Sequence, residues 1–132
     1  MVVVDTSVWV DFFRGRNVAH VAKMEHLLEE SEDICTCGIV LAEVLQGIRS
    51  ESEYARTLSR FNTFLYLEMS RNTFIRAAQI YRSLRQRGVT VSKPVDCLIA
   101  AVAIEHNVPL LHNDRDFDAI GRYSGLKVVK VL

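Results

Sequence analysis

The sequence predicts an α/β protein: a three-layer α/β/α sandwich around a central parallel sheet, in one domain that spans residues 1–132. Two observations predict this fold class. Short apolar segments alternate along the chain with longer segments of helical periodicity, which is typical of parallel α/β proteins. The first apolar segment, Val2-Val3-Val4, has no polar face, as expected of a parallel strand that helices cover on both sides.

The first half of the chain is expected to form two strands and four helices. The Val-rich start is a short strand, and Thr6 or Ser7 can cap a helix that stops near Gly15. The next helix has an apolar side, and a second apolar strand separates it from two further helices. The strands are expected at residues 1–5 and 34–37, and the helices at residues 6–13, 18–31, 41–49 and 51–61.

The second half is expected to form three strands and two helices. Its first segment alternates like a strand, and a long helix follows that ends at Gly88. Pro94 marks the start of a helix that is apolar nearly all round and is therefore expected at the centre of the fold. The strands are expected at residues 65–69, 108–112 and 127–131, and the helices at residues 73–87 and 95–106.

Four carboxylates stand in segments that are otherwise apolar: Asp5, Glu43, Asp96 and Asp114. A lone buried carboxylate is costly, and these apolar stretches contain no Lys or Arg to neutralise it. In open parallel sheets, sites form beyond the carboxyl ends of the strands. If the first strand is central and neighbours the strand at residues 108–112, all four acids gather at one edge. The positive partner expected there is a divalent metal ion.

Mg²⁺, which Mn²⁺ commonly replaces, suits such a group because it prefers oxygen ligands. A bound divalent ion can polarise a phosphoryl oxygen, lower the pKa of a bound water and stabilise a leaving oxygen. Phosphodiester hydrolysis uses all three effects. Thr6 and Ser7, which follow Asp5, either orient a carboxylate or a water at this centre or simply cap the first helix.

Composition excludes several other classes of protein. Sixteen basic and sixteen acidic residues give zero net charge, so overall charge offers no argument for nucleic-acid binding. Cys35, Cys37 and Cys97 are too few for a disulfide framework or a four-cysteine zinc site, and are expected in the core; a redox role for the first two is the alternative. No apolar run is long enough to span a membrane, and the start lacks a basic signal region, so a cytoplasmic location is expected.

The four acidic segments have recognisable sequences. They read Val2-Val3-Val4-Asp5-Thr6-Ser7-Val8-Trp9, Leu41-Ala42-Glu43-Val44-Leu45-Gln46-Gly47, Asp96-Cys97-Leu98-Ile99-Ala100-Ala101 and Leu110-Leu111-His112-Asn113-Asp114-Arg115-Asp116-Phe117. Together and in this order they resemble the PIN-domain ribonucleases, specifically the VapC-type toxins of prokaryotic toxin–antitoxin pairs. The resemblance covers the full length of the chain.

This resemblance implies that Asp5, Glu43 and Asp96 hold the principal Mg²⁺ (or Mn²⁺) ion and that Asp114 with Asp116 supports a second. Asp116 is either a ligand or a cap of the turn before Phe117. The implied reaction is metal-assisted attack of water on an RNA phosphodiester, which leaves 3′-hydroxyl and 5′-phosphate ends. The family also implies a homodimer, a cognate antitoxin protein and a larger assembly with it.

Several side chains keep two interpretations. Arg82, Arg85 and Arg87 either contact the RNA backbone or form a solvated helix face. His112 replaces a Thr of many relatives and either contacts phosphate or packs at a strand end. Asp11 and Asp118 are expected on the surface. An aromatic group either forms a dimer interface or belongs to the core; it comprises Tyr54, Phe61, Phe64, Tyr66, Phe74 and Tyr81.

Two other functions compete with the ribonuclease. A metal-dependent phosphatase is the nearest in chemistry, but the Asp-x-Asp start of aspartyl-phosphate enzymes is absent because Ser7 occupies the second acidic position. A non-catalytic PIN-like binding module is the other alternative. It is disfavoured because a scaffold has no use for acids placed in apolar segments.

Overall fold

The computed structural model describes residues 1–30 and 32–131, and its centre is a four-stranded parallel sheet. The strands are β1 (Val2–Val4), β2 (Ile34–Thr36), β3 (Leu65–Tyr66) and β4 (Leu110–Leu111), arranged in the order β3-β2-β1-β4. β1 pairs with β2 on one side and with β4 on the other. This confirms the prediction that the first strand lies next to the strand at residues 108–112.

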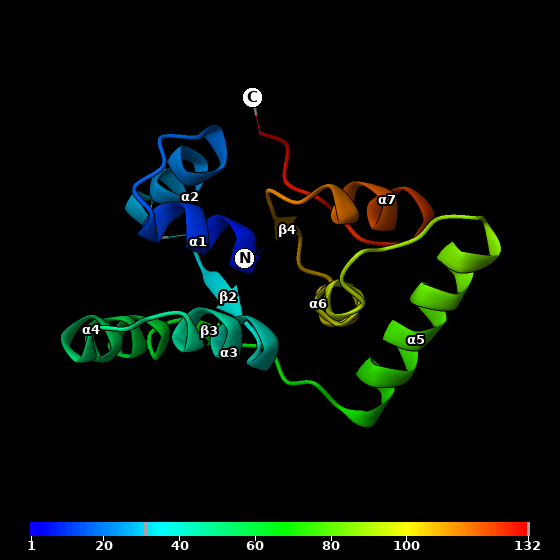
Figure 1. The fold of residues 1–132 in the computed structure, drawn as a ribbon, viewed down its shortest axis with the longest axis horizontal. Coiled ribbons are helices and arrows are strands. Elements are labelled where there is room, and N and C mark those ends of the chain that lie inside the picture. The colour runs from blue at the N-terminus through cyan, green and yellow to red at the C-terminus, as the bar shows by residue number, and fades with distance from the viewer. Residues whose placement is uncertain (31, 132) are drawn as a thin grey trace.

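Helices cover both faces of this sheet, which confirms the predicted α/β fold. Figure 1 shows α1 and α2 on one side of the sheet and α5, α6 and α7 on the other, with α3 and α4 toward its β3 edge. The helices are α1 (Thr6–Phe13), α2 (Ala19–Glu29), α3 (Gly38–Gln46), α4 (Glu51–Phe61), α5 (Arg71–Gln86), α6 (Val95–Glu105) and α7 (Arg115–Tyr123).

The core lies where β1 meets α6. Val3 and Val4 are completely buried, and five successive α6 residues, 99–103, have no exposed surface. This confirms that the apolar helix is central, and Pro94 stands at its N-cap as expected. A second packed group forms around Trp9, whose ring lies 4.9 Å from Phe61. The three cysteines are buried and free, as expected.

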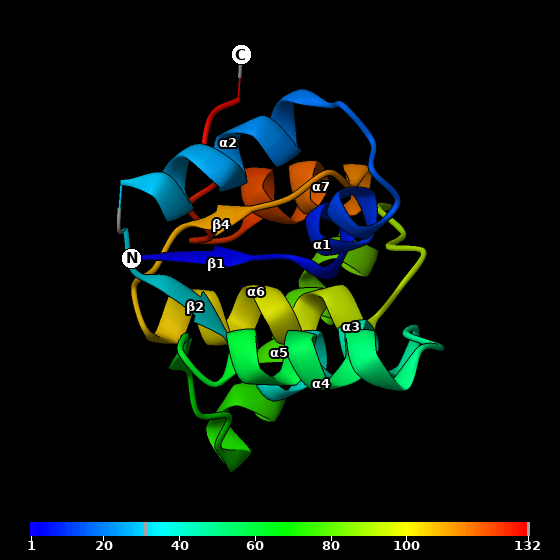
Figure 2. The same ribbon diagram turned by 90° about the vertical axis from the view of Figure 1, so that its left-hand side faces the viewer.

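The sheet and α6 together determine where the site forms. The carboxyl ends of the strands and the first turn of α6 lie at the same edge, on the right of Figure 2. The Asp5 amide donates a hydrogen bond of 2.9 Å to the Leu111 carbonyl, which joins the ends of β1 and β4. Residues that follow these strands are consequently brought to one place.

One expected strand is wrong and one helix was not expected. Residues 127–131 run beside β4 but form only an isolated bridge, between Leu110 and Val128, because a single residue pair is in register. Helix α7 escaped prediction because it is short and contains Gly121, a residue that weakens helices. It forms because Asp114 caps it and Phe117 and Ile120 bury their side chains.

Most other boundaries differ from expectation by one to three residues. Helix α3 begins at Gly38 rather than at residue 41, and the remaining strands are shorter than expected. Helix α2 ends at Glu29 in the structure, and its expected end at Ser31 lies outside the described residues. No helix within residues 1–30 and 32–131 is long and apolar enough to cross a membrane.

Candidate metal centre

Asp5 is held rigidly at the end of β1. Its side chain is 2% exposed, and its Oδ2 accepts hydrogen bonds from the Ser7 amide (3.0 Å) and the Ser7 hydroxyl (2.5 Å). Asp5 is therefore itself the N-cap of α1, a position that the sequence assigned to Thr6 or Ser7. Ser7 was expected either to orient a carboxylate or to cap the helix, and the structure supports the first role, at Asp5.

Asp5 lines a pocket at the carboxyl edge of the sheet, and Glu43 reaches this pocket from α3. Its Oε1 accepts a hydrogen bond of 2.8 Å from the Thr6 hydroxyl, which joins α1 to α3 across 37 residues of sequence. Thr6 thus also orients a carboxylate. The apolar neighbours of Glu43 bury in the core at Val40 and Val44, and this packing leaves the acid on the pocket side of the helix.

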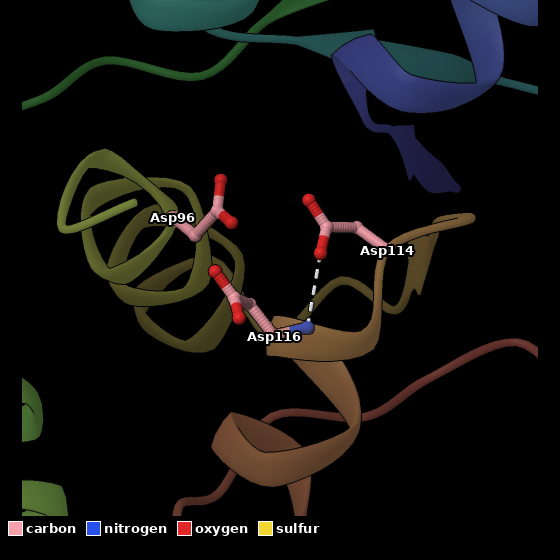
Figure 3. Close-up of side chains that lie close together, drawn as sticks. All are labelled: Asp96, Asp114 and Asp116. Atoms are coloured by element: carbon pink, nitrogen blue, oxygen red, sulfur yellow. Dashed lines mark hydrogen bonds between the residues drawn. The ribbon is translucent and has the colours of Figure 1, made fainter. Parts of the chain in front are cut away.

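Asp96, Asp114 and Asp116 form the tightest acidic group. Each offers an oxygen within 4.8 Å of the other two, and their carboxylates point toward one another in Figure 3. Asp96 lies in the first turn of α6 and is 3% exposed. Asp114 caps α7 by accepting a hydrogen bond of 3.0 Å from the Asp116 amide.

Asp116 is held by the segment before α6. Its Oδ2 accepts hydrogen bonds from the Ser92 hydroxyl (2.8 Å) and the Lys93 amide (3.2 Å). It therefore does more than cap a turn, and it lies beside Asp96 and Asp114, while its role as a metal ligand stays a prediction. Asp5 and Glu43 line the same pocket as Asp96 and Asp114 but lie outside the tight group of three.

The chain does supply a positive charge to these acids, contrary to expectation. Lys93 Nζ lies 2.5 Å from Asp114 Oδ2 and 3.9 Å from Asp96 Oδ2. Lys93 lies outside the apolar stretches that hold the acids, so the search for cations within those stretches missed it. Its position three residues before Asp96, on the loop that enters α6, was the sequence feature that could have predicted this contact.

Asp11 is a second residue that the sequence placed wrongly. It is 6% exposed rather than on the surface, and it accepts a hydrogen bond of 2.8 Å from the Asn113 side-chain amide. Arg16 lies 3.4 Å from its other oxygen. The Asn113 backbone amide also donates to the Ser7 hydroxyl (2.9 Å), so this network supports Asp5. Asp118 is exposed, as expected.

His112 packs at the end of β4, as one of its two interpretations proposed. It is 7% exposed, and its ring lies 5.1 Å from that of Phe117. Its Nδ1 accepts a hydrogen bond of 3.1 Å from the Asp114 amide. Burial lowers the pKa of His112, which favours the neutral ring that this hydrogen bond requires. His112 therefore helps to position Asp114.

Burial disfavours ionisation of Asp96 and Asp5, whereas Asp114 stays ionised more readily. Burial, reinforced by Asp5, Asp114 and Asp116, raises the pKa of Asp96 to about 7. Burial also raises the pKa of Asp5, although hydrogen bonds from Ser7 oppose the shift. For Asp114, burial is outweighed by hydrogen bonds from Lys93 and the Asp116 amide, so its pKa lies below the ordinary value.

The donor set fits a divalent metal ion. Within the described part of the chain, two buried carboxylate oxygens have no hydrogen-bond partner: Asp5 Oδ1 and Asp96 Oδ2. Buried polar atoms nearly always have a hydrogen-bond partner, so these two oxygens beside other acids are acceptors that a divalent cation could satisfy. All side chains in question offer oxygen, the ligand that Mg²⁺ and Mn²⁺ prefer.

The three arginines with two interpretations, RNA contact or a solvated helix face, lie away from the acidic pocket. Arg82, Arg85 and Arg87 are exposed on or just after α5, and none of them lines the acidic pocket. The Arg87 guanidinium lies over the Tyr123 ring at 4.9 Å. The basic side chains that do line the pocket are Arg16 and Lys93.

A comparison with family models matches residues 2–123 to the PIN domain. The chain belongs to the PIN-domain family. Ribonuclease VapC11 of Mycobacterium tuberculosis is 36% identical to this PIN domain over 129 residues, covering 96% of each chain. Ribonuclease VapC1 of Methanocaldococcus jannaschii is 32% identical over 129 residues, covering 96% of this chain and 85% of its own.

The fold has a close structural counterpart. VapBC2 from Rickettsia felis, solved bound to a DNA fragment from its promoter, contains a chain that superposes on this PIN domain with a TM-score of 0.75. The alignment covers both chains completely at 23% sequence identity. At that identity the likeness concerns the fold, and it agrees with the parallel sheet and the helices described above.

Proposed function

We propose that the protein is a Mg²⁺-dependent endoribonuclease, the toxin of a type II toxin–antitoxin pair, and that Mn²⁺ can replace Mg²⁺. The observation that carries this proposal is the convergence of Asp5, Glu43, Asp96 and Asp114 in one pocket, with two buried carboxylate oxygens unpaired. Its identity to VapC ribonucleases over most of the chain supports RNA as the substrate.

Each acid has a distinct part in this proposal. Asp5 and Asp96 would hold the principal ion through their unpaired oxygens, with Glu43 oriented toward it by Thr6. Asp114 and Asp116, which lie closest to Asp96, would complete the centre or hold a second ion. When bound, the ion lowers the pKa of a water and stabilises negative charge on phosphate oxygens.

The chain's own side chains would then place and hold the substrate. Arg16 is anchored by Asp11 at the pocket wall, and its guanidinium can meet a phosphate oxygen beside the acids. The exposed Arg82, Arg85 and Arg87 would contact the backbone farther from the cleavage point. Hydrolysis would leave 3′-hydroxyl and 5′-phosphate ends.

The proposal also includes protein partners. Solved structures of similar fold are complexes of VapC with VapB, which supports a cognate antitoxin and a larger assembly. A homodimer is supported by exposed apolar side chains on β3 and early α5, including Tyr66 and Phe74, each about half exposed. Phe61 is buried beside Trp9 and belongs to the core. We place this activity in one domain, residues 1–132, and in the cytoplasm.

The decisive experiment is cleavage of total cellular RNA by the purified, antitoxin-free protein with Mg²⁺, with EDTA, and with Asp96→Asn in parallel. We expect discrete fragments that require the metal and disappear with the variant. Asn retains the size of Asp96 but loses its charge, so a folded, inactive variant isolates the role of the carboxylate.

Two further assays separate the alternatives. Turnover of a small phosphomonoester without RNA cleavage would support a phosphatase. A folded protein that neither cleaves RNA nor releases heat when titrated with Mn²⁺ would support a non-catalytic binding module and overturn the proposal.

A further inference from the structure

Lys93 contacts two of the acids that are proposed to hold metal. Its ammonium lies 2.5 Å from Asp114 Oδ2 and 3.9 Å from Asp96 Oδ2, and these two acids belong to the tight group with Asp116. Asp96 Oδ2 is also one of the two buried carboxylate oxygens without a hydrogen-bond partner, because Lys93 lies too far from it for a hydrogen bond. An ammonium and a divalent cation repel each other strongly at such distances, so the two compete for the same oxygens.

The backbone of Lys93 is fixed from both sides. Its amide donates to Asp116 Oδ2 at 3.2 Å, and its carbonyl accepts a hydrogen bond of 3.0 Å from the Asp96 amide. Pro94 follows immediately and restricts the chain further. The main chain at Lys93 is therefore tied directly to Asp96 and Asp116.

The side chain of Lys93, by contrast, has room to leave. It is 52% exposed, and it carries its charge at the end of a flexible four-carbon stem. The ammonium can rotate into solvent while the backbone keeps its hydrogen bonds to Asp96 and Asp116. Withdrawal of the charge would free Asp114 Oδ2 without breaking the backbone hydrogen bonds to Asp96 and Asp116.

We propose that Lys93 is an internal counter-ion of the metal-free centre, and that a divalent ion binds by displacing its ammonium from Asp114 and Asp96. This rests on the proposed metal-dependent function. While the centre is empty, Lys93 offsets the repulsion among acids that converge from β1, α3, α6 and α7. Its departure sets the metal concentration at which the centre fills.

The test is calorimetric titration of the full-length protein with Mn²⁺, comparing wild type with Lys93→Met. Met keeps the length and the apolar stem of Lys93 but removes the competing charge. We expect Lys93→Met to bind Mn²⁺ about tenfold more tightly, the size of one partly exposed charged contact. Lys93→Arg retains the charge and is expected to bind Mn²⁺ near the wild-type affinity.

Lys127→Met is the matched control for loss of one positive charge. Lys127 donates a hydrogen bond of 3.0 Å to Asn107, just past the C-terminal end of α6, whereas Asp96 lies at its N-terminal end. The length of α6 separates this lysine from the centre, so its loss is expected to leave Mn²⁺ affinity near the wild-type value.

Thermal unfolding supplies an independent readout. The metal-free Lys93→Met protein is expected to unfold at a lower temperature than wild type, and Mn²⁺ is expected to raise its Tm by a larger increment. Mn²⁺ affinity of Lys93→Met equal to or weaker than that of wild type overturns the displacement proposal alone. Absence of Mn²⁺ binding by the wild-type protein overturns the metal-dependent function together with it.

Discussion

At the residue scale, the site depends on hydroxyl groups as much as on acids. Ser7 donates to Asp5 through both its amide and its hydroxyl, and Thr6 donates to Glu43. Each hydroxyl fixes the direction of a carboxylate that repulsion from its neighbours would otherwise turn aside. Loss of a partner of this kind typically lowers metal affinity or activity by about 10–100-fold.

We therefore predict that Thr6→Val lowers the rate of RNA cleavage by about 10–100-fold, the usual cost of losing such a partner. Val keeps the shape of Thr6 but no longer donates to Glu43 Oε1. Thr6→Ser restores a hydroxyl and is expected to recover most of the rate. Equal loss in both variants, measured as initial cleavage rates at saturating Mg²⁺, would show that the hydroxyl is not the cause.

At the element scale, two of the proposed metal ligands also begin helices. Asp5 caps α1 and Asp114 caps α7, each by accepting a hydrogen bond from the amide two residues later. A helix N-terminus favours negative charge, so the helices partly stabilise the acids that the metal would neutralise. The same residues thus contribute both to folding and to the proposed chemistry.

Substitutions at Asp114 should separate these two contributions. Asn is as good an N-cap as Asp, so Asp114→Asn is predicted to lose cleavage activity and the ion pair with Lys93 but to keep the cap of α7. Asp114→Ala is predicted to lose activity and in addition about 1 kcal/mol of unfolding free energy. Chemical denaturation without metal measures this difference, and equal stability of the two variants would show that the cap contributes little.

At the scale of the whole molecule, the acidic centre makes stability depend on pH. Burial raises the pKa of Asp96 from 3.8 to about 7, so across this interval the folded protein binds more protons than the unfolded chain. The unfolding free energy of the metal-free protein should therefore fall as pH rises through this window. Asp5, whose pKa is also raised, acts in the same direction, whereas Asp114 acts in the opposite one.

We predict that Asp96→Asn flattens this pH dependence and, without metal, gains roughly 1–3 kcal/mol of stability over wild type at pH 8. The gain should shrink toward pH 4, because Asp96 is then protonated in the folded wild-type protein and, like Asn, carries no charge. Denaturation curves recorded in EDTA at several pH values give the comparison. Parallel pH profiles for the two proteins would contradict a raised pKa at Asp96.

Addition of Mn²⁺ provides the control for this experiment. The ion should stabilise the wild-type protein at pH 8, because it binds the ionised acids of the native state alone. It should have a much smaller effect on Asp96→Asn, which lacks one of the two unpaired carboxylate oxygens.

The sequence by itself determined the fold class and the principal acids. Alternating apolar and helical segments were sufficient to predict the parallel sheet. Acids inside apolar segments were sufficient to predict which carboxylates line one pocket, because burial of an unpaired charge is costly wherever it occurs. The strand at 127–131 and helix α7 were misjudged, because pairing to β4 and the burial of Phe117 and Ile120 depend on tertiary packing.

Only the tertiary structure decided which other side chains meet the acids. Lys93 reaches Asp114 across 21 residues of sequence, and Asn113 reaches Asp11 across 102. Such contacts leave no periodic pattern in the chain, since they arise where the ends of β1 and β4 meet the start of α6. Local patterns therefore revealed which buried acids need a partner, and tertiary packing determined which side chains serve as those partners.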